Sequence, residues 1–433
     1  MGKKQAFRDI LHYLQKNWCP KAFALRPPYS TQQLWTAMHD DTGRLYRMPK
    51  QELTGQEMYG IWKRLIVETL GQGLESRHNR LVLVCDDQDR VPNRKRREWA
   101  KRKESRMKSQ LKEAKADGAE PAPPPRHVKY LPEKCSFTAG GLVFHETGTI
   151  ETIDMRTLRA SGAMRKDMYK YFMWMVENDF DLRQSMAPDA TFILDFHGEG
   201  PCLFQPCRGW VRLSHLRHPF GEADKALVFW AIVFRSSPTT ITSNDRDMIP
   251  ILFHYCMCEG FSRNGSPLWW IYEPRARHIT AGEAGCLHVM EMTIKLAERW
   301  TTSLFLLASC LCGTDYVEKS QCTNNAGQDV IFACVQRNKD VANGVKALFS
   351  LEAIEEAKRE EKFDLVVKMQ KHNQSSIQCW NQLLNNIKAC SRAPKAKDIQ
   401  MADRLEALDD ILFNVGYWGE TWSKFNGATE WPA

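Results

Sequence analysis

Acidic side chains recur where apolar segments of this chain begin or end. They are Asp86, Asp195, Glu222, Asp224, Asp245, Asp247 and Asp315. In open α/β sheets ligands collect beyond the carboxyl ends of the strands, so we expect these acids to face one crevice. Carboxylates gathered in one crevice repel one another unless cations lie between them. Oxygen ligands favour Mg²⁺ or Mn²⁺, and two such ions about 4 Å apart activate water and stabilise a leaving phosphate oxygen. The set therefore predicts metal-dependent hydrolysis of phosphodiesters.

Each of these acids taken alone has a simpler structural explanation, because Asp often follows a strand as a turn or helix-cap residue. Only the set, in its order along the chain, favours a metal site. A zinc site drawn from Cys202, Cys207, Cys256 and Cys258 lacks the Cys-x-x-Cys spacing of zinc fingers. We therefore predict buried free thiols there.

Positive charge is concentrated in one stripe, residues 90–115. This stripe holds twelve Lys and Arg against three Glu, a net +9, although the whole chain carries only +8. Such a stripe suits a polyanion, because each Lys or Arg that meets a phosphate releases condensed counterions. A solvated helix face and a nuclear-import signal are equally good explanations of the charge alone.

The elements that would position these groups alternate between helix and strand. Helical periodicity covers Met58–Leu70 and 166–177, whereas the runs Leu81–Cys85, Thr191–Asp195 and Thr239–Thr242 are typical of short strands. The runs 226–234 and 303–312 are apolar throughout, so their type stays open. Gly118–Pro125 predicts a linker, and 350–370 and 401–412 predict helices. This alternation predicts an α/β core with a parallel sheet.

Composition narrows the class of protein. The chain has 433 residues, 43% hydrophobic and 26% charged, which is typical of globular domains. Its longest apolar runs are about half the length of a membrane span. Fourteen cysteines without an export signal indicate a reducing compartment. We expect an intracellular protein, nuclear or cytoplasmic, without a membrane partner.

Several motifs occur in an order that resembles a known family. Val82–Asp86 is followed by Pro92 and the basic stripe, and then come Glu222-Ala223-Asp224, Asn244–Asp247 and Leu311–Tyr316. This order is similar to that of the flap endonuclease/XPG superfamily of 5′ nucleases, over roughly residues 1–115 and 205–335. The resemblance implies a PIN-like nuclease core with a mainly parallel sheet flanked by helices, and a helical C-terminal region.

Carried over by motif, the resemblance implies two Mg²⁺ ions, with Mn²⁺ possible, held directly or through water. The implied ligands are Asp40, Asp86, Glu222, Asp224, Asp245, Asp247 and Asp315. Asp40 is chosen as the first aspartate because Tyr46 follows it where the family has a base-stacking tyrosine; Asp41 is the alternative. Lys95 and Arg102, seven residues apart, would grip the scissile phosphate, with Arg94, Arg97 and Lys101 binding substrate nearby.

The chain also departs from the family. Where the family has a Gly-x-Gly element that tracks duplex DNA, residues 320–335 keep only Gly327. The substrate, DNA or RNA, is therefore open, and so is a catalytically inactive nucleic-acid-binding or assembly subunit. We expect four parts: a core segment with the basic gateway at 1–115, a linker and insertion at 116–204, a second core segment at 205–345, and a helical region at 346–433.

Overall fold

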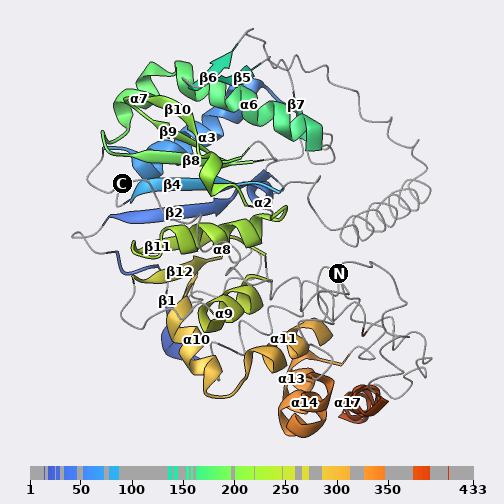
Figure 1. The fold of residues 1–433 in the computed structure, drawn as a ribbon. Coiled ribbons are helices and arrows are strands. Elements are labelled where there is room, and N and C mark those ends of the chain that lie inside the picture. Colours follow the sequence, from blue (N-terminus) through green and yellow to red (C-terminus); the bar gives the residue numbers. More distant parts are fainter. Residues whose placement is uncertain are drawn as a thin grey trace, which may run out of the picture.

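The fold of the chain is taken from a computed structural model (Figure 1). The structure describes residues 18–24, 26–29, 34–45, 52–72, 78–86, 135–138, 141–144, 153–155, 162–196, 200–218, 220–245, 247–258, 266–272, 285–312, 326–346 and 374–390, with Leu14, Leu158 and Leu408.

A nine-stranded sheet forms the centre of the molecule. Its order is β1-β13-β12-β11-β2-β4-β8-β9-β10. The five inner strands are parallel: β12 (Leu268–Ile271), β11 (Thr239–Thr242), β2 (Trp35–Asp40), β4 (His78–Val84) and β8 (Thr191–Asp195). The outer strands pair antiparallel with their neighbours: β1 (Phe23–Ala24), β13 (Cys286–His288), β9 (Cys202–Gln205) and β10 (Gly209–Arg212).

The sheet is therefore mixed, and the expectation of a mainly parallel sheet was wrong. Parallel neighbours need a crossover connection of a dozen or more residues. Only residues 196–201 join β8 to β9, and only 206–208 join β9 to β10. Connections this short allow antiparallel hairpins alone, so the sheet changes direction at this edge.

Helices cover both faces of the sheet, and an α/β architecture is confirmed. One face carries α3 (Gly55–Leu70), α6 (Gly162–Asn178) and α7 (Phe180–Ser185). The other carries α8 (Ala223–Val233) and α10 (Val289–Ala297), with α9 (Met248–Cys258) packed on both of them and α11 (Thr302–Leu311) packed on α9. Short elements are the 3₁₀ turns η2 (Pro20–Ala22) and η3 (Ser214–Leu216), helix α2 (Asp41–Leu45), and the two-stranded sheets β3 (Glu52–Leu53) with β7 (Ile153–Asp154) and β5 (Cys135–Thr138) with β6 (Gly141–Phe144).

Alternation along the inner strands divides the apolar core in two. On β4, Leu81 and Leu83 pack with α3 and α6, while Val82 and Val84 pack with the α8 side. This is the period of two that an extended strand imposes, because successive side chains point to opposite faces. An inner strand is thus buried on both sides, which is why it reads as a continuous apolar run.

The two apolar runs 226–234 and 303–312, which the sequence could not assign to helix or strand, form helices. All eleven residues of α8 are buried, from Ala223 to Val233, and α11 is buried from Leu304 to Leu311. A helix surrounded by protein is apolar on every side and loses its helical periodicity. The strands expected at 191–195 and 239–242 are confirmed at their bounds as β8 and β11.

The C-terminal part of the described chain is helical, as expected. Helices α13 (Gln328–Arg337), α14 (Lys339–Lys346) and α17 (Gln374–Cys390) pack together (Figure 1), with Trp380 fully buried. The helices expected at 350–370 and 401–412 lie outside the described residues, except for Leu408. Among the described helices, none is long and apolar enough to cross a membrane. The expected four-part division of the chain stays a prediction. Strand β8 from the expected insertion and strand β11 from the expected second core segment belong to the same sheet.

His78, at the start of β4, should make stability depend on pH. Burial lowers the pKa of its imidazole from 6.5 to about 4. The unfolded chain then binds a proton at this site between these two pH values and the folded chain does not, so the free energy of unfolding should fall as pH drops from about 6.5 to 4. Urea titrations across this range should show a shallower dependence for His78→Gln than for wild type. An equal dependence in both proteins would exclude His78 as its source.

Candidate functional site

The carboxyl ends of four neighbouring parallel strands meet at one edge of the sheet. Asp40 ends β2 and Asp195 ends β8, and both are in register with Val84 of β4. His39 is in register with Thr242, the last residue of β11. The predicted ligands Asp40, Asp86, Glu222, Asp224, Asp245 and Asp247 lie at or beside the ends of these strands and are called the acidic edge below.

Neighbouring Asp40 and Asp41 belong to different faces of the sheet. Ala37 packs on the α3 and α6 side and Met38 on the α8 side. Continued by alternation, Asp40 falls on the α8 side, which is also the side of Asp86. Asp41 is fully buried on the opposite side, so the acidic edge includes Asp40 and excludes Asp41.

Asp41 is a hydrogen-bond acceptor for two helices. Trp62 of α3 donates from Nε1 to both carboxylate oxygens at 3.1 Å, and the Tyr169 hydroxyl of α6 donates to Oδ2 at 2.9 Å. Burial, and then the charge of Asp41, raise the pKa of Tyr169 well above its usual value, so this hydroxyl stays protonated. Asp41 thus ties the end of β2 to its covering helices.

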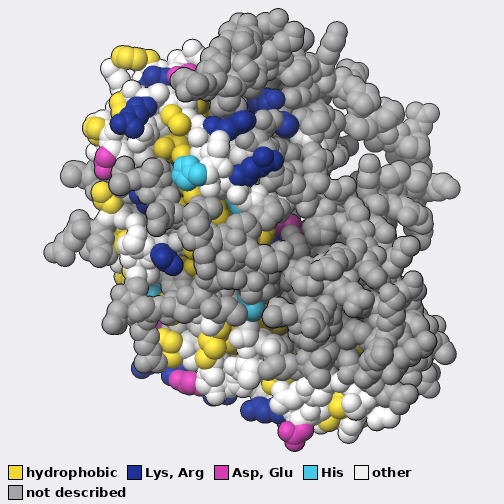
Figure 2. Space-filling model, in the orientation of Figure 1, with side chains coloured by type: hydrophobic (Ala, Val, Ile, Leu, Met, Phe, Trp, Pro, Cys, Tyr) yellow, Lys and Arg dark blue, Asp and Glu magenta, His cyan; other side chains and the backbone are white. Residues whose placement is uncertain are grey.

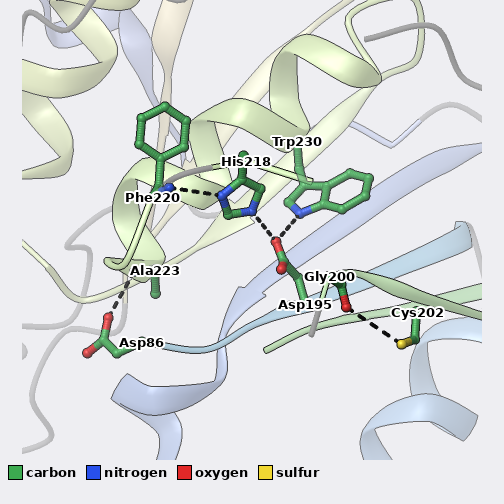
Figure 3. Close-up of polar contacts among 8 residues, drawn as sticks. All are labelled: Asp86, Asp195, Gly200, Cys202, His218, Phe220, Ala223 and Trp230. Atoms are coloured by element: carbon green, nitrogen blue, oxygen red, sulfur yellow. Dashed lines mark hydrogen bonds and ion pairs between the residues drawn. The ribbon is translucent and has the colours of Figure 1, made fainter. Parts of the chain in front are cut away.

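Asp86 is attached directly to the start of α8. Its Oδ1 accepts a hydrogen bond of 2.8 Å from the backbone N–H of Ala223, the first residue of α8 (Figure 3). Its own N–H donates to Thr42 Oγ1 at 2.7 Å. The first N–H groups of a helix have no partner within the helix and carry partial positive charge, so they suit a carboxylate.

This contact brings three predicted ligands together. Glu222 is the N-cap of α8 and Asp224 its second residue, so both flank the N–H that Asp86 accepts. Glu222 is 2% exposed and Asp224 7%. Two carboxylates buried beside a third require compensating positive charge or donors.

Asp245 and Asp247 form a turn between β11 and α9. Asp245 Oδ1 accepts the N–H of Asp247 at 3.0 Å, and the N–H of Asp245 donates to Ser243 Oγ at 3.1 Å. Trp270 holds the turn from β12 by donating to the Ser243 carbonyl at 3.0 Å. Asp247 is buried and Asp245 partly exposed. The pair could serve purely as a turn, yet it lies at the same end of the sheet as Asp40.

One charged residue of this region was missed from the sequence. Lys225 is fully buried in the first turn of α8, with its Nζ 5.3 Å from the centre of the Phe220 ring. The backbone N–H of Lys225 donates to Asp224 Oδ1 at 3.0 Å, and a buried ammonium group of this kind requires compensating partners. The available signal was a lysine placed directly after Glu-Ala-Asp and before an unbroken apolar run.

Asp195 has a buried structural environment. Its Oδ2 accepts hydrogen bonds from His218 Nε2 at 2.6 Å and from Trp230 Nε1 at 2.7 Å (Figure 3). His218 was not singled out from the sequence, because its partner is 23 residues away along the chain.

The remaining predicted residues lie outside the described part of the chain. They are Tyr46, Arg94, Lys95, Arg97, Lys101, Arg102 and Asp315. Among the described residues, no group of three or more His, Cys, Asp or Glu is arranged to hold a metal ion. Cys202 and Cys256 are buried free thiols, as predicted, whereas Cys207 is an exposed one.

The donor chemistry of the acidic edge nevertheless fits Mg²⁺. All of its side chains offer oxygen, which is the ligand type that hard cations prefer. Mg²⁺ keeps several waters and is usually held by one or two carboxylates together with substrate phosphates. The oxygen chemistry of the acidic edge is thus of the type that Mg²⁺ takes, with Asp86 bonded to the residue that follows Glu222.

Further positive charge lies on the described surface. Figure 2 shows Lys and Arg side chains gathered on the upper part of the visible face, where Figure 1 places α6 and α7. The partly or fully exposed Lys and Arg of these and adjoining elements are Lys63, Arg64, Lys166, Lys170, Arg183, Arg208 and Arg212. Lys63 is paired with Asp179 and Arg183 with Glu177.

No known protein-family model matches this chain, and no curated protein sequence is significantly similar to it.

Proposed function

We propose that this protein is a metal-dependent nuclease with a PIN-like core that hydrolyses phosphodiester bonds in DNA or RNA. The observation that carries the proposal is the contact of Asp86 with the N-terminus of α8. It joins the acid at the end of β4 to Glu222 and Asp224, which come 136 and 138 positions later in the sequence. Two motifs of the resemblance thereby meet at one place.

Asp40, Asp86, Glu222 and Asp224 are the residues that would hold Mg²⁺ or Mn²⁺, with Asp245, Asp247 and Asp315 as further ligands. A bound ion would lower the pKa of a coordinated water and stabilise charge on the phosphate oxygens. The chain itself would orient the carboxylates: the α8 N-terminus fixes Asp86, and the turn at 243–247 fixes Asp245.

Lys95 and Arg102 would bind the scissile phosphate, with Arg94, Arg97, Lys101 and Tyr46 on the adjoining nucleotides. Their charge suits a phosphate backbone because Lys and Arg release condensed counterions when they bind it. The partly or fully exposed Lys and Arg near α6 are further groups that suit a phosphate backbone. A single-stranded 5′ end is the substrate that we favour, in the nucleus or the cytoplasm.

A second candidate is a PIN-like nucleic-acid-binding subunit without catalysis. It is favoured by Lys225, a fully buried lysine in the same turn of α8 as Glu222 and Asp224. A protein cation in place of a metal ion would keep the acidic edge stable and leave it inactive.

Cleavage assays separate the two candidates. End-labelled single-stranded, flap and duplex substrates, as DNA and as RNA, are incubated with Mg²⁺, Mn²⁺ or EDTA. The nuclease is expected to yield products with either metal and none with EDTA, and Asp245→Ala should abolish them without unfolding the protein. Binding without cleavage under every condition would support the inactive subunit, and unchanged turnover in Asp245→Ala would contradict the assigned site.

A further inference from the structure

His218 holds the segment that leads into α8 at two points. One is the bond from Nε2 to Asp195 at the end of β8, 2.6 Å long. The other is the bond from the backbone N–H of Phe220 to Nδ1, 3.2 Å long. Figure 3 shows the ring lying between these two partners, and it is 6% exposed.

These two contacts define the tautomer of the imidazole. Because Phe220 donates to Nδ1, this nitrogen carries a lone pair, and the hydrogen of the neutral ring lies on Nε2. Nε2 is then the donor to Asp195. Nδ1 is thus an acceptor and Nε2 a donor, and the imidazole ring holds the two groups at a fixed separation.

Asp195 is itself fixed to α8. Trp230, two turns into the helix, donates to the same Oδ2 at 2.7 Å. The end of β8 is therefore bonded both to the helix and, through His218, to the segment that precedes the helix. The ring also packs against Phe220 and Phe229, with centroid distances of 5.4 and 4.8 Å.

The anchored segment ends at the acidic edge. Only four positions separate His218 from Glu222, and Ala223 then donates to Asp86. The segment from His218 to Ala223 is thus bonded near both ends, to Asp195 through His218 and to Asp86 through Ala223. A displacement of a catalytic group by about 1 Å can cost about 10²-fold in rate.

We propose that His218 is a positioning residue, which sets Glu222 and the Ala223 N–H against Asp86 through its bonds to Asp195 and Phe220. The proposal rests on the proposed nuclease function for its kinetic consequence, but its geometric consequence does not depend on catalysis.

Two variants separate the two bonds. In His218→Asn the amide oxygen can replace Nδ1 and keep the Phe220 bond, while the bond to Asp195 is lost. In His218→Gln the amide N–H can replace Nε2–H and keep the Asp195 bond, while Phe220 loses its acceptor. His215→Gln is the matched control, because His215 is exposed and lies three residues earlier.

Hydrogen exchange resolved to single amides, combined with steady-state cleavage in Mg²⁺, is the test. In wild type the amides of Phe220 and Ala223 should be protected. Both His218 variants should speed exchange at Ala223 by about tenfold or more while amides of α3 keep their wild-type rates, and only His218→Gln should expose the Phe220 amide. kcat should fall by about 10²-fold with KM nearly unchanged.

Wild-type exchange at Ala223 and wild-type kcat in both variants would overturn the proposal, as would a kcat loss no larger than the unfolded fraction. If neither variant folds, unprotected Phe220 and Ala223 amides in wild type would overturn it. If wild type does not cleave any substrate, the nuclease proposal fails, and the exchange rates still decide whether His218 positions α8.

Discussion

Asp86→Asn is expected to lower metal-dependent cleavage by about 10²- to 10³-fold while the protein stays folded. The amide oxygen of Asn can still accept the N–H of Ala223, so the attachment of α8 to the end of β4 is kept. The negative charge is lost, and with it the attraction for a divalent cation. Single-turnover cleavage in Mg²⁺, together with urea unfolding, measures the two effects separately.

Asp86→Ala is the comparison for this variant. It removes the charge and also the acceptor, so the Ala223 N–H at the start of α8 loses its partner. A buried or half-buried donor left without a partner costs about 1–3 kcal/mol. We therefore expect equal loss of cleavage in both variants but lower stability in Asp86→Ala alone. Full activity in Asp86→Asn would show that the charge of Asp86 has no role in catalysis.

Asp41→Ala is expected to destabilise the protein by about 3–5 kcal/mol, because it leaves the buried Trp62 N–H and Tyr169 hydroxyl without their acceptor. That is a large share of the 5–15 kcal/mol that typically holds a domain together. Asp40→Ala, one residue earlier and partly exposed, should change stability by less than about 1 kcal/mol and should abolish cleavage.

The pair of variants tests the division of the two acids between the two faces of the sheet. Unfolding free energies come from urea titration, and cleavage is compared at a temperature at which both variants are folded. A stable Asp41→Ala protein without activity, beside an active Asp40→Ala protein, would reverse the assignment and make Asp41 the ligand.

Three inner strands of the sheet, β4, β8 and β11, could be predicted from local composition. The runs Thr191–Asp195 and Thr239–Thr242 became strands at the predicted bounds, because short apolar or β-branched segments fit a pleated, buried surface. Asp195 ends the first of these strands and Asp245 follows the second, so the sequence alone placed both acids at strand ends. Helix α8 was not identifiable, since burial on all sides removes the polar stripe that reveals a helix.

The tertiary structure decided which of these acids lie on the same side of the sheet. Asp40 and Asp41 are adjacent residues of the same type. Only the packing of α3 and α6 on one face of the sheet and α8 on the other distinguishes them. The same holds for His218, whose partner Asp195 belongs to another element. Residue types and the period of two are local properties of the chain. The side of the sheet that each helix covers is set by burial of apolar surface from distant segments. A local sequence pattern therefore cannot predict which side a given helix covers.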